Sequence, residues 1–281
     1  MSEPTLAARV ATWAARSPEV VAIVLIGSHA RETGDNTAGA DAHSDWDFHL
    51  ITSRPARFAD QAWTTNLGEG EPLSYAIREG IVGKVKRVTA LFRDAEADFV
   101  ILPTGQMRLA RLAVACGLHR RSRGLARALG DLAIVARPGY RFLHGSSRWE
   151  PFYRRVMAEV ADPRLGDAEV RRRAELFVAD YVWVRRKLTR GEILAAQRVL
   201  HRSLAEINFQ LLHEAKLRRG ERSFPDARRI ERIVSTTELA AVTVAAGPAV
   251  ASLEAALQQC ATTCRDLLRE LVGERWRWPN V

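Results

Sequence analysis

An apolar segment that stops at a glycine, followed by a segment that alternates acids with apolar residues, constrains this chain more than any other feature. The first segment is Val20–Ile26, and it ends at Gly27-Ser28. A short apolar run bounded by turn residues is typical of a buried strand, and a glycine at its end lets the backbone approach another group closely. The second segment, residues 44–51, reads Ser-Asp-Trp-Asp-Phe-His-Leu-Ile. We therefore expect two core strands joined by a polar loop.

The second strand should carry paired carboxylates. Side chains alternate between the two faces of a strand, so Asp45, Asp47 and His49 share one face. Residues two apart on a strand have Cα atoms about 6.5–7 Å apart, so both carboxylates can converge on one hard cation. Ser28 is expected to start a short helical segment whose free N–H groups favour anions. The pattern predicts a metal site beside a phosphate site, with Gly27 and Ser28 contacting the triphosphate.

The arrangement Gly27-Ser28, a spacer, then Asp45-Trp46-Asp47 resembles the Gly-Ser…Asp-x-Asp motif of the DNA polymerase β-like nucleotidyltransferase superfamily. Members of that superfamily use a third carboxylate on a later strand. Two strand-like runs, 88–92 and 97–102, are joined by Arg-Asp-Ala-Glu, which predicts a hairpin. Asp98 is a lone acid in the second run, where an unpaired charge would be costly. The resemblance implies that Asp98 joins Asp45 and Asp47 as a ligand of Mg²⁺, with two ions expected and ATP as the co-substrate.

Two further segments narrow the resemblance. The pattern Leu-Phe-x-Asp…Asp-Phe…Leu-Pro over residues 91–103 is similar to that of the aminoglycoside 6-adenylyltransferases, the streptomycin-modifying branch. The aromatic segment 175–183 and the Lys-Leu-Thr-Arg-Gly-Glu turn at 187–192 also resemble that family. The resemblance implies transfer of AMP from Mg-ATP to a hydroxyl of an aminoglycoside, with release of pyrophosphate, as in antibiotic resistance.

The expected fold is an α/β (α+β) nucleotidyltransferase domain with a mixed sheet over residues 1–148, followed by an all-α helical bundle domain over 149–281. Residues 138–145 should add an edge strand, and 126–137 fits a helix or a strand equally well. Trp276 and Trp278 should pack on the helical core, because exposed indoles would be unfavourable. The expected helices span 6–15, 56–66, 106–115, 168–190 (with Asp167 as N-cap), 192–218, 237–246 and 249–272.

Three further residues are candidates for substrate binding or catalysis, and each has an alternative interpretation. Arg31 could reach a phosphate or face solvent. Glu192 could act as general base, bind a substrate cation, or complement a helix dipole at the first turn. Asp180 lies among Phe177, Tyr181 and Trp183; facing inward, it could bind a substrate cation between aromatic walls, and facing outward it is ordinary surface.

Further side chains near the expected site are secondary candidates. Lys84, Lys86 and Arg87 flank the strand before the hairpin. His29 and His49 could contact phosphate or water, although a surface or packing role is the favoured interpretation of both.

The composition is that of an ordinary globular protein, with 281 residues, 47% hydrophobic and 27% charged. The apolar runs are too short to span a bilayer and no signal sequence is evident, so no membrane partner is expected. The net charge is +9, nearly all of the cations are arginines, and many of these lie at helical spacing among acids, so we do not take the charge to predict nucleic-acid binding. The cysteines, Cys116, Cys260 and Cys264, form no disulfide framework, which favours a reduced, cytoplasmic protein.

Two alternatives to the aminoglycoside function remain open at this stage. The enzyme could transfer a nucleotide to another small metabolite, a protein hydroxyl or an RNA end. The chain could also be an inactive module that binds a nucleotide or a partner. The expected ligands are a nucleoside triphosphate and a small, hydroxyl-bearing, cationic substrate.

Overall fold

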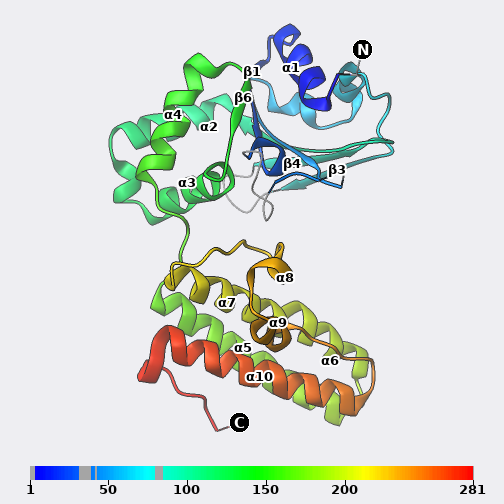
Figure 1. Ribbon diagram of the computed structural model, residues 1–281, viewed down its shortest axis with the longest axis vertical. Helices are drawn as coiled ribbons and strands as arrows, with labels where there is room; N and C mark the ends of the chain where they lie inside the picture. The colour runs from blue at the N-terminus through cyan, green and yellow to red at the C-terminus, as the bar shows by residue number, and fades with distance from the viewer. Residues whose placement is uncertain (1–3, 32–38, 42, 80–84, 281) are drawn as a thin grey trace. The chain divides into compact units, whose positions relative to one another are not determined.

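The chain forms two compact units, Met1–Pro163 and Arg164–Val281, in the computed structural model (Figure 1). The structure describes residues 4–31, 39–41, 43–79 and 85–280. The boundary expected at 148/149 lies within helix α4, Ser146–Glu159. Trp149, Phe152 and Val156 of this helix are buried in a core of the first unit, so the whole of α4 is part of that unit.

A mixed sheet forms the centre of the first unit, as expected from the sequence; it has six strands in the order β3-β4-β5-β2-β1-β6. The pair β2–β5 is parallel, and every other neighbouring pair is antiparallel. The strand β3 was not predicted, because its residues are mostly exposed at a sheet edge and carry little apolar alternation. The strands are β1 Val20–Ile26, β2 Trp46–Thr52, β3 Ser74–Glu79, β4 Lys86–Leu91, β5 Glu96–Pro103 and β6 Arg141–His144.

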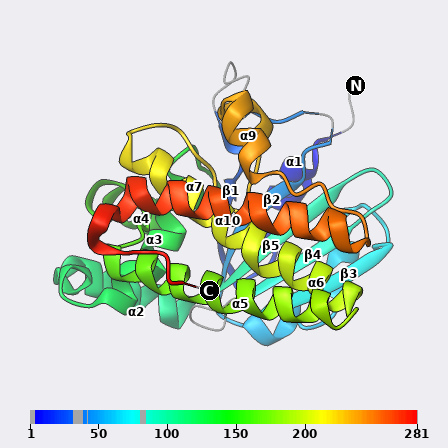
Figure 2. The ribbon, with the colours of Figure 1, turned by 90° about the horizontal axis from the view of Figure 1, so that it is seen from below.

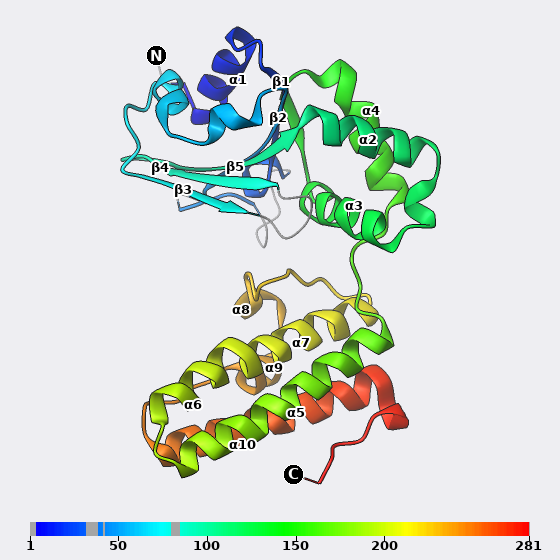
Figure 3. The same ribbon diagram turned by 180° about the vertical axis from the view of Figure 1, so that it is seen from behind.

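Each face of the sheet has its own core. One face, which includes Leu25, Phe48 and Phe99, packs against α1 (Leu6–Arg16) and the turns that follow β2. The opposite face, which includes Val24 and Ile51, packs against α4 and two further helices. Those helices are α2, Thr104–Ala115, and α3, Arg123–Ala136. Figures 1 and 3 show α1 on one side of the sheet and α2, α3 and α4 on the other.

In two segments of the first unit, the secondary structure differs from the prediction or decides between two predicted alternatives. The helix expected over 56–66 is wrong: the chain forms two short 3₁₀ turns there, η2 Pro55–Phe58 and η3 Ala62–Leu67. Asp60 accepts a hydrogen bond from the Ala62 N–H, at 2.9 Å, and this local side-chain turn competes with a continuous helix. The undecided segment 126–137 lies in α3, which Ser122 caps by accepting from the Leu125 N–H.

The second unit is helical, as expected. Helices α5, α7 and α10 run beside one another around its core (Figure 2). Trp276 and Trp278 pack on that core, which confirms their expected role. Gly166, not Asp167, is the N-cap of α5, and Glu169 accepts from the Gly166 N–H. The helices are α5 Asp167–Thr189, α6 Ile193–Val199, α7 Glu206–Arg218, α8 Ile230–Ile233, α9 Thr236–Val242 and α10 Val250–Val272.

The helix expected over 192–218 contains a π-helical turn, η5 Leu200–Ala205, between α6 and α7. Such turns are rare in proteins and occur frequently at functional sites. Across the described residues, no helix combines the length and the apolar character needed to cross a membrane.

Candidate active site

The register of the sheet brings the three predicted carboxylates together. Ile26, the last residue of β1, is opposite Asp47 on β2, and Asp47 is in turn opposite Asp98 on the parallel strand β5. Residues directly opposite each other in a sheet point to the same face. Asp45 precedes β2 by one residue, and one oxygen from each of Asp45, Asp47 and Asp98 lies within 4.8 Å of the others. Three carboxylates at this spacing form a donor set that suits a hard divalent cation.

Gly27 lies against the carboxylate of Asp47. Its backbone has φ +70° and ψ −154°, a region that is essentially restricted to glycine. A Cβ atom on residue 27 would lie 2.2 Å from Asp47 Oδ2. The close approach inferred from the sequence is therefore present, and the group that requires it is a carboxylate of the site. The conformation of Gly27 allows Asp47 to face the other two acids.

The segment after Gly27 is a 3₁₀ helix of three residues. Ser28 is buried and starts the short helical segment that was expected, which is a single 3₁₀ turn, Ser28–Ala30. Arg31 follows this turn and is half-buried. The carbonyl of Ala30 lies close to Gly139, where an added Cβ would approach it to 2.6 Å. The turn is thus held against the loop before β6, and phosphate binding by Gly27, Ser28 and Arg31 stays a prediction.

Asp98 has two protein partners on the neighbouring strand β4. It is buried, with 3% of its surface exposed. Arg87 donates to Asp98 Oδ2 through its Nε, at 3.0 Å, and through a terminal nitrogen, and the Thr89 hydroxyl donates to Oδ1. From the sequence, a metal would explain a charged acid in these apolar surroundings. The structure adds a counter-charge from within the chain, that of Arg87.

All three aspartates of the site affect the pKa of Arg87. Burial alone would lower the pKa of Arg87, but its hydrogen bond to Asp98 and the charges of Asp98, Asp47 and Asp45 raise that pKa above its ordinary value. Arg87 was a secondary candidate in the sequence, and Thr89 was missed. Their alternate positions on a strand that pairs with Asp98 are the signal that could have identified both.

The other two basic candidates near the hairpin, Lys86 and Lys84, differ from Arg87. Lys86 is adjacent to Arg87 on β4, so it points to the opposite face of the sheet. Lys84 lies outside the residues that the structure describes.

Both histidines near the acids pack against aromatic side chains, which confirms the favoured interpretation. The His29 ring stacks on Trp46 with the ring centroids 3.8 Å apart and the planes at 3°. The buried His49 has its Nδ1 2.9 Å from the Tyr153 hydroxyl of α4. Burial lowers the pKa of His49 to about 4, so this imidazole is neutral at pH 7. His49 therefore ties the strand that carries Asp47 to the helix behind it.

In the second unit, Asp180 accepts a hydrogen bond from the Ser203 hydroxyl, which belongs to the π-helical turn. Asp180 is half-buried. The expected aromatic walls are partly wrong. Phe177 and Tyr181 face the core, where both rings make edge contacts with Trp278, because the helical stripe that packs against α10 includes them.

Trp183 is the aromatic residue of α5 that remains accessible, with 39% of its surface exposed. The Lys187 Nζ lies 5.0 Å from the centre of its ring and donates to Glu192 Oε2 at 2.5 Å. Glu192 occupies the N-cap position of α6 without a side-chain capping bond. Trp183, Lys187 and Glu192 thus form a continuous chain of contacts on one surface of the second unit.

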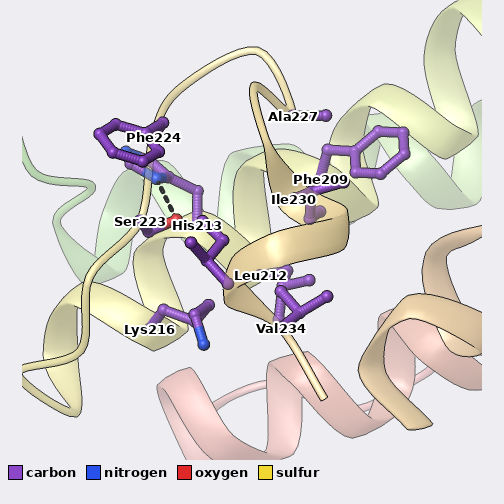
Figure 4. A pocket seen from close by; sticks show the side chains of 10 residues that line it. Phe209, Leu212, His213, Lys216, Ser223, Phe224, Ala227, Ile230 and Val234 are labelled. Carbon is purple, nitrogen blue, oxygen red and sulfur yellow. Dashed lines mark hydrogen bonds between the residues drawn. The ribbon is translucent and has the colours of Figure 1, made fainter. Parts of the chain in front are cut away.

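A small pocket lies between α7 and the chain that follows it (Figure 4). His213 Nδ1 is 2.8 Å from the Ser223 hydroxyl, and Lys216 Nζ is 2.6 Å from a carboxylate oxygen of Glu221. Burial lowers the pKa of His213. Most of the lining is apolar, and these polar groups are satisfied by partners within the protein. We therefore assign the pocket to packing, in contrast to the acidic site.

No protein-family model matches this chain, and no curated protein matches its sequence. Two of the solved structures that are similar to it are as follows. One is an aminoglycoside 6-adenyltransferase from Bacillus subtilis, with 13% identity over 99% of this chain and 94% of that chain and a TM-score of 0.42. The other is a nucleotidyltransferase-like protein from Exiguobacterium sibiricum, with 9% identity over 95% of this chain and 74% of that chain and a TM-score of 0.36.

Proposed function

We propose that this protein is a nucleotidyltransferase that transfers AMP from ATP to a hydroxyl of a small cationic molecule of the aminoglycoside class. The observation that supports this most is the convergence of Asp45, Asp47 and Asp98 from separate segments beside the constrained Gly27. Oxygen donors in this number suit Mg²⁺, which commonly binds through carboxylates together with substrate phosphates. The motif resemblance supplies the choice of AMP and of the acceptor class.

The proposed reaction is a displacement at the α-phosphorus. The acceptor oxygen forms a bond to the α-phosphorus, the bond from that phosphorus to the α–β bridging oxygen breaks, and pyrophosphate leaves with the bonding electron pair. The hydroxyl proton passes to a general base or to water. Bound Mg²⁺ supplies neutralisation of phosphate charge and activation of the hydroxyl. Asp45, Asp47 and Asp98 are the residues that would hold it.

The other candidate site residues have proposed roles in binding the two substrates. The N–H groups at Gly27 and Ser28, and the guanidinium of Arg31, are proposed to contact the phosphates. Asp180 and Glu192 are proposed to bind the ammonium or guanidinium groups of the acceptor, and Glu192 is also the candidate base. Anionic oxygens form charge-assisted hydrogen bonds with such groups.

Pyrophosphate release from Mg-ATP against a panel of aminoglycosides tests the reaction. The wild-type protein is compared with Asp47→Asn, Asp98→Asn and the control Asp94→Asn, which changes an exposed acid in the β4–β5 hairpin turn. Loss of the metal ligand charge should cost several kcal/mol of transition-state stabilisation, so we expect the first two variants to lose about 100-fold or more of the rate. The control should retain the wild-type rate.

The same assay separates the alternatives. Turnover only with RNA or with a protein acceptor would refute the aminoglycoside substrate but not the chemistry. Full activity of Asp47→Asn would refute the mechanism. Binding of ATP without turnover on any acceptor would favour the inactive module.

A separate comparison tests acceptor binding. Asp180→Asn keeps the shape of the side chain and can still accept from Ser203, but it removes the charge. We expect KM for the aminoglycoside to rise about tenfold, roughly the loss of one charge-assisted hydrogen bond, with KM for ATP unchanged. Glu175→Gln, at an exposed position of the same helix, is the control. Equal increases in both KM values would argue against a role of Asp180 in acceptor binding.

A further inference from the structure

We propose that Arg87 is a built-in counter-cation of the carboxylate site, which competes with the divalent cation for Asp98 and weakens metal binding when no nucleotide is present. This inference rests on the proposed function, because it concerns regulation of the same site. Arg87 lies on β4, outside the Gly-Ser…Asp-x-Asp motif from which the site was predicted.

The contacts of Asp98 carry the inference. Its two carboxylate oxygens are engaged by different donors, Oδ2 by the Arg87 guanidinium and Oδ1 by the Thr89 hydroxyl. Both donors belong to β4, the antiparallel neighbour of β5, and Thr89 is directly opposite Asp98. A cation that uses Asp98 must therefore share Oδ2 with the Arg87 guanidinium, share Oδ1 with the Thr89 hydroxyl beside that positive charge, or displace one of the two donors.

Electrostatics makes sharing unfavourable. Guanidinium does not lose its proton in proteins, so Arg87 cannot relieve the conflict by becoming neutral. Three carboxylates within 4.8 Å repel one another, and Arg87 offsets part of that repulsion in the metal-free protein. A divalent cation would offset the same repulsion and would itself be repelled by Arg87. The two positive groups are thus alternative partners of the same acids.

The structure also allows Arg87 to leave. Its side chain is 48% exposed, whereas that of Asp98 is 4% exposed. The guanidinium can turn toward solvent, or toward the phosphates of a bound nucleotide, by side-chain rotation alone. Thr89 continues to donate to Asp98 and keeps the carboxylate in place. A nucleotide would therefore provide Arg87 with new anionic partners as the metal takes Asp98.

Mn²⁺ binding to the nucleotide-free protein, followed by electron paramagnetic resonance of the free ion, tests the competition. We expect Arg87→Gln to bind Mn²⁺ threefold to tenfold more tightly than the wild type, a difference of about 0.7–1.4 kcal/mol. Arg87→Lys retains the charge and should stay near the wild-type Kd. The matched control is Arg78→Gln, because Arg78 is exposed on β3 directly opposite Arg87. It should bind Mn²⁺ within about twofold of the wild type, since an exposed, more distant charge is screened.

A second measurement uses the unmodified side chain, so the test does not depend on the folding of Arg87→Gln. The side-chain Nε–H resonance of Arg87, assigned by its absence in Arg87→Lys, should shift when Mg²⁺ is added to the nucleotide-free protein. Unchanged or weaker Mn²⁺ binding by Arg87→Gln, or an Arg87 resonance that Mg²⁺ does not move although it binds, would overturn the inference.

The two levels of the proposal fail in different ways. Absence of Mn²⁺ binding in both the wild type and Arg87→Gln would refute the metal site on which the proposed function rests. Binding that persists unchanged in Asp47→Asn would do the same. Metal binding that depends on Asp47 but not on Arg87 would leave the proposed function intact and refute only the role of Arg87.

Discussion

Replacement of Gly27 by alanine should damage stability and the carboxylate site together. The backbone at this position has φ +70° and ψ −154°, and an alanine there would cost about 1–3 kcal/mol in backbone strain. The added Cβ would also lie 2.2 Å from Asp47 Oδ2, so the carboxylate or the strand end must move. We expect a total loss of about 2–4 kcal/mol in the free energy of unfolding, since overpacking adds about 1 kcal/mol or more.

The control separates strain from displacement of the acid. Gly117 has φ +69° and ψ 14°, and an added Cβ there meets nothing within 4 Å. Gly117→Ala should therefore lose only about 1–2 kcal/mol, the cost of a left-handed conformation. Chemical denaturation gives both values, and a Mn²⁺ titration reports the state of the site. If Gly27→Ala matched Gly117→Ala in stability and bound Mn²⁺ like the wild type, the assigned contact between residue 27 and Asp47 would be wrong.

Two further outcomes follow from groups buried elsewhere in the fold. Glu214 is 2% exposed and accepts hydrogen bonds from Arg164 and Arg218, so Glu214→Gln should lower the free energy of unfolding by about 2–3 kcal/mol in chemical denaturation. The control is Glu150→Gln, which removes the charge of an exposed ion pair with Arg154 and should cost less than about 0.5 kcal/mol. His49 has a pKa of about 4 when folded and 6.5 unfolded, so the unfolded chain binds the proton first as pH falls. The stability that neutral His49 contributes is therefore fully present above pH 6.5 and is lost toward pH 4, by up to about 3 kcal/mol. Denaturation curves at successive pH values measure this loss, and a His49→Gln protein with the same pH dependence would refute the assignment.

The sequence was sufficient for the parts of the site whose signals are local. The apolar run that ends at Gly27 and the alternation around Asp47 define strands by themselves, because period-two burial is visible within a few residues. Asp98 was identifiable as a lone acid in an apolar strand. The register that brings these residues together then follows from strand pairing, and the structure has Asp47 directly opposite Asp98.

Features that depend on a distant partner were not predictable in the same way. Asp98 gains Arg87 only because β4 pairs with β5 in a particular register, and a shift of one residue would turn Arg87 to the other face. On α5, the spacing of Phe177 and Tyr181 fits a core stripe as well as a ligand wall. Their contacts with Trp278, far along the chain, decide between the two.

The parallel pairing of β2 with β5 has a consequence for how the protein acquires its chemistry. Asp47 and Asp98 are adjacent in the sheet, yet β3 and β4 lie between their strands in the chain. Parallel strands come together only after a long crossover closes, which is slow compared with helix formation. A folding chain can therefore possess helices and hairpins while Asp47 and Asp98 are still apart. The carboxylate cluster is therefore complete only when the centre of the sheet has formed.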